Sequence, residues 1–67
     1  MGHIEIRARG EGFAVRVVRG DDVRDSYVTN TLGISAVFEE YGVGEIGPVE
    51  DVTDENGEVY RRAPFIG

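Results

Sequence analysis

Residues 30–42, which read NTLGISAVFEEYG, form the one segment of this chain with a clear helical period. Its large apolar residues are Ile34, Val37, Phe38 and Tyr41. They recur at i, i+3, i+4 and i+7, a spacing that places all of them on one stripe of a helix. Glu39 and Glu40 fall on the opposite face. The pattern predicts one amphipathic helix that packs its apolar stripe against the rest of the chain.

The ends of this helix also carry recognisable signals. Asn30 or Thr31 can cap its first turn, and Gly42 can adopt the left-handed conformation that ends a helix. Gly33 costs about 1 kcal/mol relative to alanine inside a helix, so we expect the regular part to begin near Ile34.

Two segments before the helix, residues 3–9 and 13–19, are typical of β-strands. In the first, apolar and polar residues alternate strictly, as in a strand with one buried face. A two-residue turn at Gly10-Glu11, of type II′, sets three apolar pairs on one face: Ile4 opposite Val17, Ile6 opposite Val15 and Ala8 opposite Phe13. Glu5 then lies opposite Arg16 on the outer face. A loop one residue longer would place Arg16 among the apolar residues, so we favour the shorter turn.

The segment between this hairpin and the helix is less regular. Gly20-Asp21-Asp22 has the composition of a turn. Val23–Val28 is either a short edge strand or an irregular lead into the helix, because its arginine and aspartate fit neither face of a strand well. We favour the edge strand.

After the helix, residues 49–53 and 58–62 predict a second hairpin. A three-residue loop, Glu55-Asn56-Gly57, sets these pairs: Val52 opposite Tyr60, Asp51 opposite Arg61 and Glu50 opposite Arg62. Pro48 cannot donate to a ladder, so the strand starts at or after it or lies at an edge. The apolar tail, residues 63–67, either enters the core or contacts a partner. The predicted fold is therefore α+β, a single domain over residues 1–67: a small antiparallel sheet in ββ(β)αββ order, covered by one amphipathic helix. Which strands are neighbours in the sheet is left open.

Length and composition restrict the class of protein. With 67 residues and no cysteine, the chain has neither disulfides nor a thiolate metal site. Its stability must come from packing, from a partner or from self-association. No apolar run approaches the roughly 18 residues of a membrane span, and no signal-peptide pattern is present. We expect a soluble, cytoplasmic protein.

Negative charge is concentrated in the second half of the chain. The net charge is −6, and residues 1–30 balance to zero, so the whole excess lies in residues 31–67. The acidic residues there are the first candidates for a partner-binding surface: Glu39, Glu40, Glu45, Glu50, Asp51, Asp54, Glu55 and Glu58. Such a surface repels phosphate backbones and can imitate them towards a basic protein.

Three patterns suggest chemistry, and each is explained by turns or surface residues. Residues 42–47 match G-x-G-x-x-G, but they follow a helix and run into Pro48, whereas a nucleotide site needs a strand before the motif and a helix after it. Asp54, Asn56 and Gly57 resemble part of a calcium loop, yet the positions of two required carboxylates hold Val52 and Ala63. His3 is the only histidine, and one histidine with no cysteine and only scattered acidic residues does not make a metal site or a catalytic group. We therefore expect no enzyme activity, no cofactor and no metal.

Arginines on the first hairpin are a second candidate surface. Arg7, Arg9, Arg16 and Arg19 can form a basic stripe on the outer face, interrupted by Glu5. We expect no aromatic residue on that face to stack a base, and therefore a solvated face with cross-strand ion pairs.

Three functional hypotheses follow. The first is a small, acidic, non-enzymatic protein that binds a larger protein. Such a protein could be an inhibitor of the kind that phages and mobile elements encode against host machinery. It would act by covering a surface of its target or by imitating nucleic acid. The second is a homodimeric structural or regulatory domain, paired through an edge strand or through Tyr41, Phe65 and Ile66. The third is a nucleic-acid binder that uses the arginine face.

Overall fold

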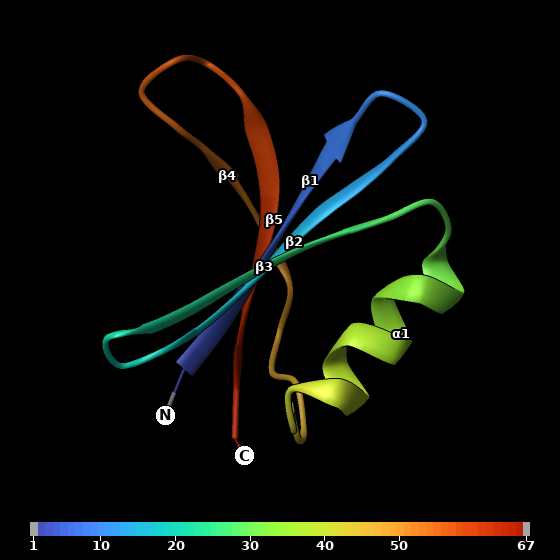
Figure 1. Cartoon of the computed structure of the whole chain (residues 1–67). Coiled ribbons are helices and arrows are strands. Elements are labelled where there is room, and N and C mark those ends of the chain that lie inside the picture. Colours follow the sequence, from blue (N-terminus) through green and yellow to red (C-terminus); the bar gives the residue numbers. More distant parts are fainter. Residues whose placement is uncertain (1, 67) are drawn as a thin grey trace.

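The computed structural model describes residues 2–66 as one antiparallel sheet and one helix. Its elements are β1 (Gly2–Arg9), β2 (Gly12–Arg19), β3 (Asp22–Val28), α1 (Thr31–Glu40), β4 (Glu50–Thr53) and β5 (Val59–Phe65). The strand order is β3-β2-β1-β5-β4, so the first and last strands are neighbours at the centre (Figure 1). The α+β class, the order of elements and the third strand are confirmed.

The first hairpin has the predicted register. Gly10 lies at a φ of 56°, and Ala8 pairs with Phe13, Ile6 with Val15 and Ile4 with Val17. Because side chains alternate along a strand, these apolar residues all lie on one side of the sheet. We call this side, against which α1 packs, the helix side, and the other side the open side.

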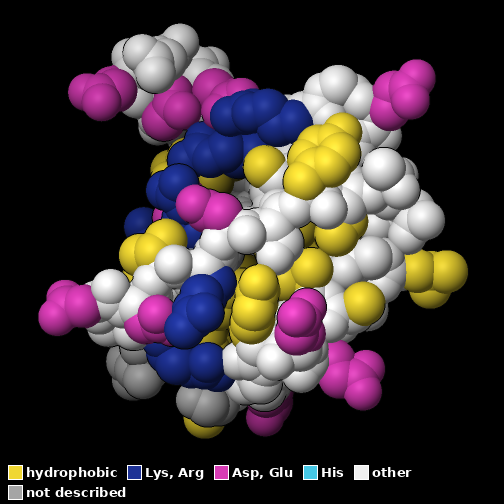
Figure 2. Space-filling model, viewed as in Figure 1, with side chains coloured by type: hydrophobic (Ala, Val, Ile, Leu, Met, Phe, Trp, Pro, Cys, Tyr) yellow, Lys and Arg dark blue, Asp and Glu magenta, His cyan; other side chains and the backbone are white. Residues whose placement is uncertain are grey.

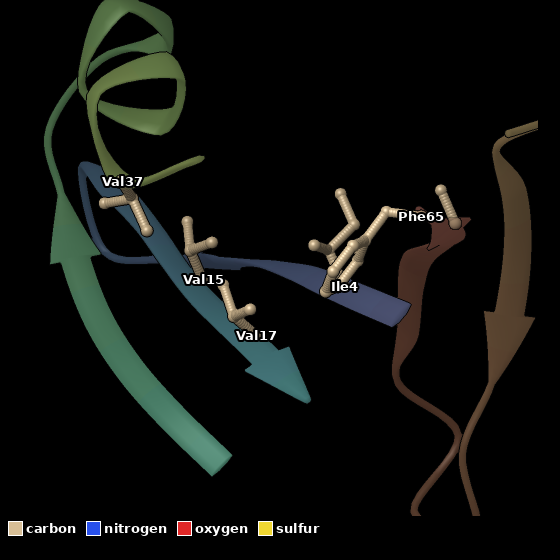
Figure 3. Close-up of a cluster of buried hydrophobic side chains, with 6 residues drawn as sticks. Ile4, Val15, Val17, Val37 and Phe65 are labelled. Atoms are coloured by element: carbon tan, nitrogen blue, oxygen red, sulfur yellow. The ribbon is translucent and has the colours of Figure 1, made fainter. Parts of the chain in front are cut away.

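The core lies between the helix side and α1. Its buried hydrophobic residues are Ile4, Val15, Val17, Val37, Ala63 and Phe65. Figure 3 shows Val37 of α1 lying over Val15 and Val17 of β2, while Ile4 and Phe65 meet across β1 and β5. The remaining members of the predicted helical stripe, Ile34, Phe38 and Tyr41, are half-buried around this core. The apolar stripe predicted from the sequence therefore does face the sheet.

The start of α1 differs from the prediction. The helix begins at Thr31, one turn earlier than expected, with Asn30 as its N-cap. The Asn30 Oδ1 atom accepts a hydrogen bond of 2.8 Å from the backbone N–H of Gly33. A Cβ atom at Gly33 would lie only 2.7 Å from Cβ of Val28 in β3. Glycine is therefore present because the helix and the strand approach closely here, and not because the helix has yet to begin.

The other end of α1 is closed by its own backbone and by an arginine from the sheet. Gly42 has a φ of 67°, and the N–H of Val43 donates to the Phe38 carbonyl at 2.8 Å, as in a Schellman motif. Arg19 donates to the carbonyls of Tyr41 and Gly42 at 2.7 and 2.8 Å. Its guanidinium also lies 5.1 Å from the centroid of the Phe65 ring. Arg19 thus ties the end of the helix to the edge of the core.

The second hairpin also matches the prediction. Val52 pairs with Tyr60, Asp51 with Arg61 and Glu50 with Arg62, and Gly57 in the loop has a φ of 82°. In the tail, Ala63 and Phe65 of β5 are buried, whereas Ile66 is 72% exposed. Gly67 lies outside the described residues.

Candidate functional site

The helix covers only part of the helix side. α1 packs against β2 and β3, and a helix about 10 Å wide spans about two strands at their spacing of about 4.8 Å. The loop after α1 covers one end of the remaining sheet: Ile46 bridges to Phe65, and the Gly47 N–H donates to the Pro64 carbonyl at 2.8 Å. The opposite end of β1 and β5 is left uncovered.

An open groove of about 500 Å³ occupies this uncovered end. Residues of α1 line it on one side and residues of the β4–β5 hairpin on the other, with β1 and β2 between them. We call it the helix-side groove and define it by its apolar lining: Ile6 and Ala8 of β1, Phe13 of β2, Ile34 of α1 and Val59 of β5. Val59 is 59% exposed, so a large apolar side chain on the groove wall faces solvent.

The polar residues of the groove are few and exposed. Thr31, Asp51 and Arg61 contribute to its lining. The Arg61 Nε atom lies 3.7 Å from Asp51 Oδ1, and both side chains are 71% exposed. An ion pair this exposed contributes less than about 1 kcal/mol, so a ligand can rearrange it at small cost. The groove can therefore accept an apolar group and still meet charged groups at its rim.

None of the apolar groove residues was among the candidate site residues predicted from the sequence. The alternation of the strands placed Ile6, Ala8 and Phe13 on the buried face, which suggested core. The available signal was a mismatch of size: one short helix cannot cover the helix side of a sheet with four or five strands.

The structure brings three of the four predicted arginines together. Arg7 and Arg9 of β1 and Arg16 of β2 lie on the open side, as the register requires. Arg19 does not join them, because its guanidinium caps α1 on the helix side. The predicted stripe of four arginines is wrong in this respect. Figure 2 shows basic side chains interleaved with acidic ones on the left of the view.

Arg7 is the centre of an ion-pair network. It donates to Glu58 at 3.0 Å, to Asp54 at 3.3 Å and to Glu5 at 3.2 Å. Its guanidinium carbon lies 3.8 Å from the centroid of the Tyr60 ring. The prediction that no aromatic residue lies on this face is wrong. Tyr60 of β5 and Tyr27 of β3 both lie there, because strands outside the first hairpin complete the open side.

Arg9 and Arg16 are paired in the same way. Arg9 donates to both carboxylate oxygens of Glu58, and this hydrogen bonding lowers the pKa of Glu58 below its ordinary value and raises the pKa of Arg9. Arg16 lies opposite Glu5 as predicted, yet its Nε atom donates to Asp25 of β3 at 2.8 Å. That hydrogen bond raises the pKa of Arg16. The guanidinium groups of Arg7, Arg9 and Arg16 therefore already bind carboxylates.

The predicted acidic residues do not form one surface. Glu39 and Glu40 end α1, and Glu45 lies in the following loop. Glu50 and Asp51 are in β4 on opposite sides of the sheet, since neighbouring strand residues alternate. Asp54 and Glu58 bind Arg7, and Glu55 is exposed in the turn between them. The carboxylates are thus divided among several places, and part of their charge is neutralised.

The remaining patterns have structural roles. The G-x-G-x-x-G segment, residues 42–47, follows the C-cap of α1 and forms the loop in which Ile46 bridges to Phe65. The calcium-like segment is a hairpin turn in which Asp54 Oδ1 accepts from the N–H groups of Asn56 and Glu58 at 2.9 and 3.0 Å. His3 lies 2.9 Å from Glu5 on the open side.

Comparisons with known proteins gave no match among protein-family models, curated proteins or solved structures. Within residues 2–66, no group of three or more His, Cys, Asp or Glu side chains is placed to hold a metal ion. No helix in the same range is long and apolar enough to cross a membrane.

Proposed function

We propose that this chain is a small, non-enzymatic protein-binding domain whose helix-side groove receives an apolar side chain from a larger protein. The observation that carries the proposal is an apolar groove of about 500 Å³ left open by the single helix. Exposed apolar surfaces of this kind are typical of interaction sites. The net charge of −6 favours a partner segment with lysine or arginine beside the apolar anchor.

The chemistry of the groove suits a protein side chain better than a substrate. Small-molecule sites are apolar clefts in which a few precisely placed polar groups fix one ligand, and catalytic sites add titratable groups that face one another. Around this groove the residues with polar side-chain atoms are Thr31, Tyr60 and the exposed pair Asp51 and Arg61, and Tyr60 lies against Arg7 on the open side. Ile6, Phe13 and Ile34 form an apolar floor and wall, which can bury an aromatic or aliphatic anchor.

The mode of action follows from size and chemistry. A domain of 67 residues can cover a functional surface of a larger enzyme, as small inhibitors of phages and mobile elements do. We place this action in the cytoplasm, where a chain without cysteine needs no oxidising compartment to fold. Imitation of nucleic acid is less well supported, because the acidic side chains are scattered and Asp54 and Glu58 are engaged by arginine.

Binding of nucleic acid to the open side also has less support. Arg7, Arg9 and Arg16 each already donate to a carboxylate, and a phosphate would have to displace it. The cost of leaving those carboxylates unpaired, next to a phosphate, opposes such an exchange.

The test uses peptide selection with two matched variants. Val59 and Val49 are both 59% exposed, but only Val59 lines the groove. Val59→Arg and Val49→Arg therefore make the same chemical change inside and outside the site. A random peptide library is selected on the wild-type protein, and the affinity of recovered peptides is measured by fluorescence anisotropy.

We expect recovered peptides to contain an apolar anchor beside basic residues. They should bind wild-type protein and Val49→Arg equally, and Val59→Arg about tenfold or more weakly, which is the usual effect of disturbing an anchor site. Equal loss in both variants, equal binding to both, or failure to recover any peptide with measurable affinity would overturn the proposal. Far-UV circular dichroism establishes that each variant is folded.

A further inference from the structure

We infer that the chain forms a symmetric dimer in which β3 pairs antiparallel with β3 of a second copy, centred on Asp25, so that two five-stranded sheets become one. The inference rests on the two edges of the sheet, which differ in length and chemistry. It does not depend on the function proposed for the helix-side groove.

The edge formed by β4 is poorly suited to pairing. It has four residues, follows Pro48 after one intervening residue and begins with Glu50 and Asp51. Short edge strands, prolines and charges are the devices by which proteins protect sheet edges.

The edge formed by β3 is longer and contains no proline, and its charged residues, Asp22, Arg24 and Asp25, are of both signs. It runs for seven residues without proline or lysine, and each residue has a partner in β2 in an unbroken register. Within residues 2–66 nothing pairs with its outer edge, because β3 is the first strand in the sheet order. Val23 and Tyr27 are 49% and 57% exposed. Long, regular edges with exposed apolar residues are templates for another strand.

The turn before β3 determines which of its backbone groups are free. Gly20-Asp21 is a two-residue turn closed by Arg19 and Asp22. The closing pair of such a hairpin exchanges both of its hydrogen bonds, and bonded pairs then alternate with non-bonded pairs. The N–H and C=O groups of Val23, Asp25 and Tyr27 therefore point away from β2, to the open edge.

One register uses all three of these residues. If Asp25 lies opposite Asp25 of the second copy, Val23 lies opposite Tyr27 and Tyr27 opposite Val23. All three pairs are then hydrogen-bonded pairs, and the two strands overlap over their whole length. The same register places Val23 beside Tyr27 on the open side, but the Tyr27 ring leans over Gly12 of β2 and its hydroxyl donates to the Arg9 carbonyl at 2.9 Å. The pairing therefore rests on the backbone hydrogen bonds and not on a contact between these side chains.

The central pair brings two carboxylates together, and each has its own counter-ion. Arg16 donates to Asp25 within each copy at 2.8 Å. Across the dimer axis the charged groups would then follow in the order Arg16, Asp25, Asp25 of the second copy and Arg16 of the second copy, so that each aspartate has an arginine on its far side. This arrangement offsets most of the repulsion between the two aspartates. We therefore expect a weak, reversible dimer and not a permanent one.

Single cysteines test both the association and the register, because the natural chain contains none. In the proposed register, Cα atoms of the two residues at position 25 lie about 5.5 Å apart, which a disulfide can span. The two residues at position 23 are offset by four residues, or about 13 Å, which a disulfide cannot span. Asp25→Cys and Val23→Cys are oxidised under the same mild conditions, and covalent dimer is measured on non-reducing gels over time.

We expect Asp25→Cys to form covalent dimer at least about tenfold faster than Val23→Cys, as the difference in spacing requires. Equal rates would indicate random collision, and a faster reaction of Val23→Cys would indicate another register. Either outcome overturns the inference.

Sedimentation of the unmodified chain provides the second measurement. Wild-type protein should change from monomer to dimer between about 10 µM and about 1 mM, the range of weak interfaces. Val23→Lys, which adds an edge lysine, should remain a monomer, whereas Val49→Lys, away from β3, should behave as wild type. A wild-type chain that is monomeric throughout this range, or a Val23→Lys dimer of unchanged strength, overturns the inference.

Discussion

Replacing Gly33 by alanine separates two physical effects that predict opposite results. Helix propensity alone predicts that Gly33→Ala stabilises the protein by about 1 kcal/mol, since the position lies inside α1. The structure predicts the reverse. The added Cβ would lie 2.7 Å from Cβ of Val28 and 3.1 Å from its Cγ1. A Cβ atom is attached to the backbone and cannot rotate away, so α1 and β3 would have to separate.

The magnitude follows from these two terms. Overpacking a close contact costs about 1–3 kcal/mol, and the absence of any rotamer change that relieves this contact places the cost in the upper part of that range. After subtraction of about 1 kcal/mol for helix propensity, the free energy of unfolding should fall by about 1–2 kcal/mol. For a domain of this size, that corresponds to a melting temperature lower by roughly 4–16 °C.

Urea denaturation followed by circular dichroism measures the change, and two further variants identify its cause. Ala36 is exposed on the same helix, so Ala36→Gly measures the propensity difference without a steric contact. Val28→Gly removes the opposing Cβ atom. In that background, Gly33→Ala should become stabilising by about 1 kcal/mol. If Gly33→Ala stabilises the otherwise unchanged protein, the close approach of α1 and β3 is refuted.

Three other predictions concern arginines and their partners. Arg19→Met should lower the free energy of unfolding by about 1–2 kcal/mol, because the carbonyls of Tyr41 and Gly42 lose a charged donor; Arg24→Met, which removes an exposed arginine paired with Asp22, serves as the control and should change it little. Glu58, whose pKa is lowered in the folded state by Arg9, contributes stability above its unfolded pKa of about 4.3 and loses it as the pH falls through the lower folded value. Urea denaturation should be measured at several pH values from above the unfolded pKa of Glu58 down to below its folded pKa. Over this pH range Glu58→Gln should lose less stability than wild type, and an equal loss would contradict the ion pair between Glu58 and Arg9 as the cause. Finally, labelled single-stranded and duplex DNA should show no mobility shift at low salt, because Arg7, Arg9 and Arg16 are occupied; a shift that disappears with added salt would contradict this.

Much of the fold was predictable because its signals are local. The register of the first hairpin follows from the need to place Ile4, Ile6 and Ala8 on the same face as their partners, and Gly10 selects the turn. The second hairpin follows in the same way from Gly57 and from the charges of its strands. Each of these signals lies within about a dozen residues of the contact that it specifies, so no knowledge of the whole fold is needed to read it.

The features that could not be predicted depend on contacts between distant segments. Pairing of β1 with β5 joins the two ends of the chain, and no local pattern specifies it. The early start of α1 depends on Val28 approaching Gly33, and the position of Arg19 depends on where the helix ends. The ion pairs of the open side follow the same rule. Arg7 binds Asp54 and Glu58, which lie 47 and 51 residues away in the sequence.

The same limit explains why the helix-side groove was not predicted. Ile6, Phe13 and Ile34 have the pattern of core residues, and they would be core in a protein with a second helix. Here a ten-residue helix is about 15 Å long and covers two strands of the sheet, so apolar residues at one end of β1 and β5 are left exposed. A sequence pattern indicates which face of a strand is apolar. Whether that face is buried depends on whether the helix is large enough to cover the whole sheet, which the pattern does not indicate.

The two inferred surfaces are compatible because they lie at different parts of the sheet. The groove is formed by β1, β2, β5 and α1 together with β4 at its rim, whereas pairing would occur along the outer edge of β3. A two-fold axis perpendicular to the sheet places both copies of α1, and therefore both grooves, on the same side of the joined sheet. In such a dimer, neither groove would be covered by the second copy, because the grooves lie over β1 and β5, away from β3. A dimer of this kind would present two anchor sites to one partner surface, and the second binding event would then be intramolecular. Weak association through β3 and weak binding in each groove would in that case reinforce one another, which gives a small chain a way to bind firmly without a large interface.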